Sequence, residues 1–181
     1  YLLANCLTAI STYAIDLPLF RERIFPFTEI ITTKFQLIQN LPVSVTIAMC
    51  EALTRFLTKF EDNKDIFELI INIDFHNILS AASAIDCLNA VVQTISQVAG
   101  SPFLLPNEFY SQKEIDNQAA RLIDLFLNIL AVSTNLINIE KQDSCVTLKN
   151  EMITIRCVLA YTTQLYRNLL NINETMTCEL F

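Results

Sequence analysis

The chain has 181 residues, of which 52% are hydrophobic and only 17% charged, and its formal net charge at pH 7 is −7. Twelve Lys and Arg residues are scattered among nineteen acidic ones, which argues against binding to a nucleic-acid backbone or an anionic membrane surface, because both require clustered basic side chains. The single Gly also argues against an all-β fold, since tight hairpin turns need positive φ angles.

In the first part of the chain, apolar residues recur at three- and four-residue spacing. They predict a helix over residues 2–13 and a second helix over residues 20–39, which Pro26 kinks or divides. Pro42 is well placed in the first turn of a third helix that reaches about residue 60. The sequence therefore predicts an all-α protein from its first elements.

Further helices follow after a polar turn. Asn63 or Asp62 can cap a short helix that reaches about residue 73, because both side chains accept hydrogen bonds from free backbone amides. From His76 the apolar pattern predicts one long helix. It ends at Gly100, the only Gly, which is followed by Ser and Pro.

The last part of the chain begins with a capping box. Ser111 and Glu114 have the spacing at which each side chain satisfies a free backbone amide of the other residue. They predict the start of a long helix to about residue 136. The polar residues 140–143 are expected to interrupt the helical pattern, and another helix follows to about residue 170.

We expect residues 1–181 to form one all-α repeat domain, a fragment of a longer chain, with a weak internal break near residues 100–111. The most apolar stretches carry polar residues at helical spacing, so we expect amphipathic rather than membrane-spanning helices. Six cysteines without a Cys-x-x-Cys pair, and one His, predict free thiols, no metal and no cofactor. An intracellular location, cytoplasmic or nuclear, is expected.

Internal recurrence favours stacked repeats. Similar short runs begin at Leu7, Leu53, Leu88 and Leu130, separated by 46, 35 and 42 residues. These separations average 41, within the period of armadillo and HEAT repeats. The sequence therefore predicts an α-solenoid of armadillo- or HEAT-like repeats, and a globular helical bundle is the alternative.

One passage carries the resemblance more specifically. Residues 52–57, the run from Asn63 to Glu68, and Leu79 resemble the junction between two armadillo repeats, and residues 7–31 are similar. The resemblance implies a right-handed superhelix whose concave face, lined by the last helix of each repeat, binds a peptide segment or helical subunit of another protein. It implies a partner-binding ladder of Thr54, Arg55, Thr58 and Lys59, then Asn89, Gln93 and Gln97, then Asn128 and Asn135. The same side chains can instead be the solvated side of amphipathic helices.

The predicted function is that of a non-catalytic scaffold that docks partner proteins within a larger complex. No phosphate-binding loop or nucleophile motif is present, so we expect no enzyme activity, although His76 near Asp74 could form an acid–base pair. A bundle that binds a peptide helix or a small apolar ligand is one alternative. Another rests on residues 152–159 and 176–180, which resemble the C-terminal region of the ATR-interacting checkpoint protein and imply a regulatory subunit of a DNA-damage checkpoint kinase.

Overall fold

The structure, a computed structural model, describes residues 2–37, 41–80, 85–105 and 108–143. Within these ranges, the backbone but not the side chains of residues 34–37, 85 and 133–143 is described. All the regular structure in these ranges is helical, which confirms the all-α prediction. The elements are α1 (Leu2–Ala9), the π-helical turn η1 (Ile10–Ala14), α2 (Pro18–Arg21), α3 (Ile24–Leu37), α4 (Val43–Lys59), α5 (Lys64–Ile71), α6 (Phe75–Ser80), α7 (Ile85–Ala99), the 3-10 turn η2 (Pro102–Leu104) and α8 (Gln112–Asp143). The helix expected up to residue 170, and the segments that resemble the checkpoint protein, lie outside the described residues.

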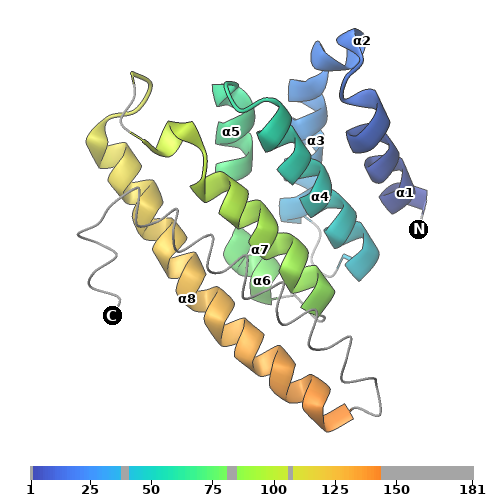
Figure 1. The fold of residues 1–181 in the computed structure, drawn as a ribbon, viewed down its shortest axis with the longest axis vertical. Helices are drawn as coiled ribbons and strands as arrows, with labels where there is room; N and C mark the ends of the chain where they lie inside the picture. Colours follow the sequence, from blue (N-terminus) through green and yellow to red (C-terminus); the bar gives the residue numbers. More distant parts are fainter. Residues whose placement is uncertain (1, 38–40, 81–84, 106–107, 144–181) are drawn as a thin grey trace.

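The helices are arranged in layers (Figure 1). Helices α1, α4 and α7 lie side by side and run in the same direction, and α4 contacts both of its neighbours. Helices α3, α5 and α6 lie behind them and run the opposite way, with α3 against α5. Helix α8 runs antiparallel to α7 and contacts both α7 and α6. Helices α1, α4 and α7 are called the front layer below.

Several helix ends follow from local sequence signals, as predicted. Pro42 immediately precedes the first residue of α4. The side chain of Asn63 caps α5 by accepting a hydrogen bond from the Ile66 amide, at 3.0 Å. At the start of α8, Glu114 Oε2 accepts from the Ser111 amide at 2.8 Å, while Ser111 Oγ accepts from the Glu114 amide at 3.4 Å. The capping box is therefore confirmed in both directions.

Three predicted boundaries are wrong. The helix expected over residues 20–39 is divided into α2 and α3, but the division lies at residues 22–23 rather than at Pro26. Pro26 lies in the first turn of α3, where its missing amide would have had no helical partner. The single helix expected from His76 is two helices, α6 behind and α7 in the front layer. The interruption expected at residues 140–143 is absent, since α8 continues to Asp143. Glu, Lys and Gln are good helix formers, so polarity alone does not end a helix.

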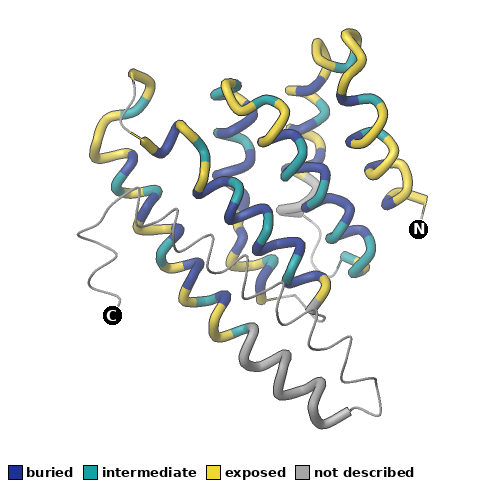
Figure 2. The backbone as a smooth tube through the Cα atoms, in the orientation of Figure 1, coloured by how far each residue is buried: buried dark blue, intermediate teal, exposed yellow. Residues whose placement is uncertain are grey.

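The core lies between the front layer and the helices behind it (Figure 2). Its fully buried large side chains come from α4, α5, α6, α7, α8 and the turns between them: Phe56, Leu53, Ile66, Ile70, Ile73, Leu79, Leu88, Ile95, Leu104 and Ile129. The segment expected as a weak break is joined to this core, because the Phe103 ring packs on Phe67 of α5 with centroids 5.2 Å apart. One continuous core therefore fixes the front layer, which carries most of the predicted site.

Candidate partner-binding surface

Two adjacent front-layer helices carry seven of the nine predicted partner-binding residues. On α4 they fall on the half-buried or exposed positions of one side, and α7 presents a second row at four-residue spacing. We call these seven residues the α4–α7 polar surface: Thr54, Arg55, Thr58, Lys59, Asn89, Gln93 and Gln97. Since α4 and α7 pack along their lengths, the two predicted rows do lie on neighbouring helices.

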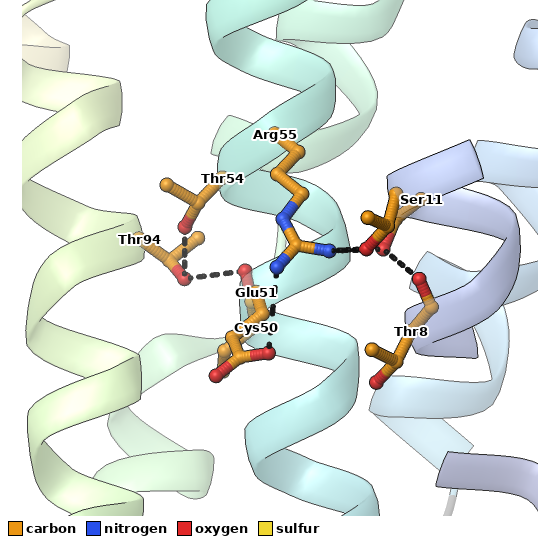
Figure 3. Close-up of polar contacts among 8 residues, drawn as sticks. Thr8, Ser11, Cys50, Glu51, Thr54, Arg55 and Thr94 are labelled. Carbon is orange, nitrogen blue, oxygen red and sulfur yellow. Dashed lines mark hydrogen bonds and ion pairs between the residues drawn. The ribbon is translucent and has the colours of Figure 1, made fainter. Parts of the chain in front are cut away.

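Arg55 joins α4 to the neighbouring helical turn η1 (Figure 3). Its Nη1 donates to Ser11 Oγ at 3.0 Å and also to Thr12 Oγ1. Its Nη2 lies 4.0 Å from Glu51 Oε2, one turn earlier on α4, which makes a long and weak ion pair. Hydroxyl groups of the adjacent element thus hold the Arg55 guanidinium in place, and 39% of the side chain remains exposed.

A buried hydroxyl joins α4 to α7. Thr94 is fully buried, and its Oγ1 lies 3.1 Å from the Cys50 carbonyl oxygen of α4 and 3.1 Å from the Ala90 carbonyl oxygen of its own helix. The Thr54 hydroxyl lies 3.1 Å from the same atom (Figure 3). Carbonyl oxygens only accept and Thr94 has one hydroxyl proton, so Thr54 supplies the proton of the third contact. Thr54 is therefore a structural contact between helices as well as a surface residue.

Thr58 and Lys59 lie at the C-terminal end of α4. The Thr58 hydroxyl donates to the Thr54 carbonyl oxygen at 2.9 Å, so it is directed back along its own helix. Lys59 forms an ion pair with Asp16, which follows η1 in the chain. The hydrogen bond and charge of the Lys59 ammonium hold the pKa of the exposed Asp16 carboxyl below its usual value of 3.8. Lys59 is thus already engaged within the chain.

The amide side chains of α7 are the least engaged part of the surface. Gln93 and Gln97 are half-buried, and no described residue forms a hydrogen bond with either amide group. The Oδ1 atom of Asn89 is buried without a hydrogen-bond partner among the described residues. The Gln93 and Gln97 amides offer both donors and an acceptor, which is the set of groups that peptide backbone can pair with, whereas the buried Asn89 Oδ1 is not open to a partner.

The third predicted row does not continue this surface. Asn128 lies on α8 and faces α6, where its Nδ2 is 3.2 Å from His76 Nδ1. His76 Nε2 lies 3.1 Å from Asp124 Oδ2, so a neutral ring with its proton on Nε2 satisfies both contacts. The carboxylate that pairs with His76 is therefore Asp124, whereas Asp74 caps α6 through the Asn77 amide. Asn135 lies in α8 beyond the described side chains.

The sequence interpretation missed the residues that link the front-layer helices. Ser11, Thr12 and Thr94 were not singled out, yet they make the contacts with Arg55, Thr54 and the α4 backbone. One signal was available: each of these contacts joins residues 40 to 44 positions apart, close to the suspected repeat period. A polar residue at that offset within an apolar helix face marks a possible contact between helices.

Other candidate sites are limited. No group of three or more His, Cys, Asp or Glu side chains among the described residues is suited to hold a metal ion. Within the same part of the chain, no helix combines the length and apolar character needed to cross a bilayer. A pocket of about 130 Å³ lies between α5, the segment after α7 and the start of α8, and it includes Phe67, Glu68 and Tyr110. Pockets for drug-sized ligands usually measure about 300–1,000 Å³, so this one is small.

The front layer is therefore linked by hydroxyl contacts and carries a polar surface with few charges.

In the small pocket beside α5, the Tyr110 hydroxyl donates to Glu68 Oε1 at 2.9 Å. Burial together with the Glu68 carboxylate raises the pKa of Tyr110. Comparison with protein-family models, curated proteins and solved structures gives no match for the chain.

Proposed function

We propose that this chain is an α-solenoid segment of armadillo- or HEAT-like repeats that acts as a non-catalytic scaffold. In this proposal each front-layer helix and the helices behind it form one repeat, so that α1, α4 and α7 are equivalent. The α4–α7 polar surface binds an extended segment of another protein.

The observation that carries the proposal is the stacking of front-layer helices through contacts of one recurring sequence separation. Arg55 reaches Ser11 across 44 residues, and Thr94 reaches Thr54 across 40 residues and the Cys50 carbonyl across 44. Neighbouring repeats in a solenoid contact one another in this way, because each repeat packs on the next with a similar offset. The buried Leu7, Leu53 and Leu88 also occupy α1, α4 and α7, whereas Leu130 is 41% exposed on α8 and does not fit this series.

The chemistry of the surface supports an extended protein segment as the ligand. Gln93 and Gln97 are one helical turn apart, and their amide groups form no hydrogen bond with a described residue. Arg55 adds a guanidinium that is oriented by Ser11. Amide side chains can donate to backbone carbonyls and accept from backbone amides whatever the partner's sequence. The surface therefore favours contact with peptide backbone, and the single oriented guanidinium suits an acidic side chain nearby.

The proposal is tested by comparing the proteins that copurify with the tagged 181-residue chain and with a Gln93→Ala/Gln97→Ala variant. We expect at least one partner to fall by about tenfold or more with the variant, the loss that follows from about 1.4 kcal/mol of binding energy. Neither side chain forms a hydrogen bond with a described residue, so the melting temperature of the variant should differ little from that of the wild type.

A matched variant controls for the loss of two amide groups. Gln112→Ala/Asn117→Ala changes two exposed amides on α8, away from the front layer. Partners that bind through the α4–α7 polar surface should be retained at wild-type levels by this control. If every copurifying protein binds both double variants equally, the proposed surface is wrong.

A further inference from the structure

The small pocket beside α5 combines buried apolar residues with two carboxylates. Its lining includes Ile71, Leu104 and Ile115, which are buried, together with Glu68 of α5 and Glu114 of α8. The pocket measures about 130 Å³, and a cavity of about 150 Å³ accommodates a molecule the size of benzene. It therefore suits a small ligand group that joins an apolar part to a positive charge.

The two carboxylates each keep one oxygen for a further donor. Glu68 Oε1 accepts from the Tyr110 hydroxyl at 2.9 Å and lies 3.3 Å from Lys64 Nζ. Glu114 Oε2 accepts from the Ser111 amide at 2.8 Å and from the Ser111 hydroxyl at 2.7 Å. A carboxylate accepts through both oxygens, and no described residue donates a hydrogen bond to Glu68 Oε2 or Glu114 Oε1.

The charges around the pocket favour a cation. Burial raises the pKa of the Tyr110 hydroxyl, and the Glu68 carboxylate that accepts its hydrogen bond raises that pKa further. The charges of Glu114 and Asp65 add to the increase, so three carboxylates act on the same point. Hydrogen bonds within the capping box hold the pKa of Glu114 below its usual value of 4.5, so this carboxylate is negative at neutral pH.

The chain itself places an ammonium group beside this pocket. Lys64 Nζ lies 5.1 Å from the centre of the Tyr110 ring and 5.9 Å from the centre of the Phe109 ring, within the range of cation–π attraction. Lys64 does not belong to the lining of the pocket. Its ammonium therefore shows which chemistry this region attracts, and it leaves the pocket open to a second cation.

We propose that the pocket binds a primary alkylammonium group, carried either by a lysine side chain of another protein or by a free aliphatic amine. The ammonium donates to Glu68 Oε2 and Glu114 Oε1, while the alkyl chain packs on Ile71 and Ile115. An ammonium has donors and no acceptor, which matches paired carboxylates, and a chain of about four carbons fits the volume. None of the residues of the α4–α7 polar surface lines this pocket, so the proposal goes beyond the proposed scaffold function.

NMR titration of the labelled 181-residue chain with n-butylammonium at neutral pH tests the proposal. We expect the side-chain amide signals of Gln118, which lines the pocket, to shift with a dissociation constant on the order of a few millimolar, as for a ligand this small. The neutral n-butanol has the same alkyl chain and should bind at least about tenfold more weakly. Equal affinities for the two, or no shift with n-butylammonium, would overturn the proposal.

The double variant Glu68→Gln/Glu114→Gln removes both charges and keeps the internal contacts. Glutamine also accepts from Tyr110 and also serves in a capping box, so the circular dichroism spectrum should be unchanged. We expect the dissociation constant for n-butylammonium to rise at least about tenfold. The matched control Glu61→Gln/Asp62→Asn removes two charges from the exposed turn before α5, outside the pocket, and should retain wild-type affinity. Equal weakening by both double variants would reduce the effect to net charge and sink the proposal.

A blocked lysine distinguishes the two sources of the alkylammonium group. Nα-acetyl-lysine methylamide carries the same butylammonium chain on a peptide backbone. Binding at least as tight as that of n-butylammonium supports a lysine side chain of another protein as the ligand. Binding that is weaker by about tenfold or more supports a free amine, because the backbone then prevents the chain from entering.

Discussion

The Thr94→Val substitution gives the most direct test of how α4 and α7 are held together. The two side chains have nearly the same shape, so the change removes the buried hydroxyl and its contacts with Thr54 and the Cys50 carbonyl while it keeps the packing. The Cys50 and Ala90 carbonyls lie within helices and keep their helical partners. No buried group is left unsatisfied, and we expect a loss of about 1 kcal/mol in the free energy of unfolding, the net contribution of one hydrogen bond.

The assay is urea unfolding followed by circular dichroism, with the free energy taken from linear extrapolation. A double-mutant cycle with Thr54→Val isolates the Thr54–Thr94 contact, and we expect a coupling energy of about 0.5–1 kcal/mol. Thermal unfolding should show a decrease of about 2–4 °C for Thr94→Val, given the size of the chain.

Thr28→Val is the matched control. Thr28 is also fully buried, but its hydroxyl donates at 2.8 Å to the Ile24 carbonyl oxygen within its own helix α3. Such contacts within one helix contribute little, so this change should be close to neutral. If Thr94→Val is as stable as the wild type, or if both substitutions cost the same, then the hydroxyl contact does not join the two helices in the way described.

Three further predictions concern local features. NMR titration should show that Lys59→Met returns the pKa of Asp16 towards 3.8. Because that pKa is lowered in the folded protein, the Lys59–Asp16 pair stabilises the fold above pH 3.8, and its contribution is lost as the pH falls through the lowered pKa. A wild-type pKa in the variant would refute the pairing. Burial raises the pKa of the Cys50 thiol, so Cys50 should resist maleimide at pH 8 until the chain unfolds, while the exposed Cys6 is modified. Peptide mapping after brief treatment checks this, and equal labelling of the two thiols in native buffer would contradict it. Ser111→Ala should lower the free energy of unfolding by about 1 kcal/mol through loss of the cap of α8, whereas an unchanged urea midpoint would show that the cap is dispensable.

The predicted surface depended partly on local information and partly on packing. Helical periodicity placed Gln93, Gln97 and Thr54 on the polar sides of their helices, and the structure has them there. Asn128 follows the same periodicity, but α8 turns it towards His76 of α6. Periodicity identifies the side of a helix that avoids the core, and it does not say which neighbour lies beside that side.

The sequence by itself determined the all-α class and the helix ends that depend on nearby residues. Pro42, Asn63 and the Ser111–Glu114 capping box act within one turn of the helix they start, so their effect can be predicted without knowledge of the fold. The end of α7 at Gly100 is of the same kind.

Only the tertiary structure decided how the helices pair. No Gly or Pro lies between His76 and Ala99, so the sequence offers no strong local signal that divides α6 from α7; the two helices differ in the layer to which they pack. The contacts of Arg55 with Ser11, and of Thr94 with Thr54, join residues 44 and 40 positions apart. Such contacts form only when whole helices stack side by side, because their geometry depends on the burial of the entire apolar face rather than on neighbouring residues.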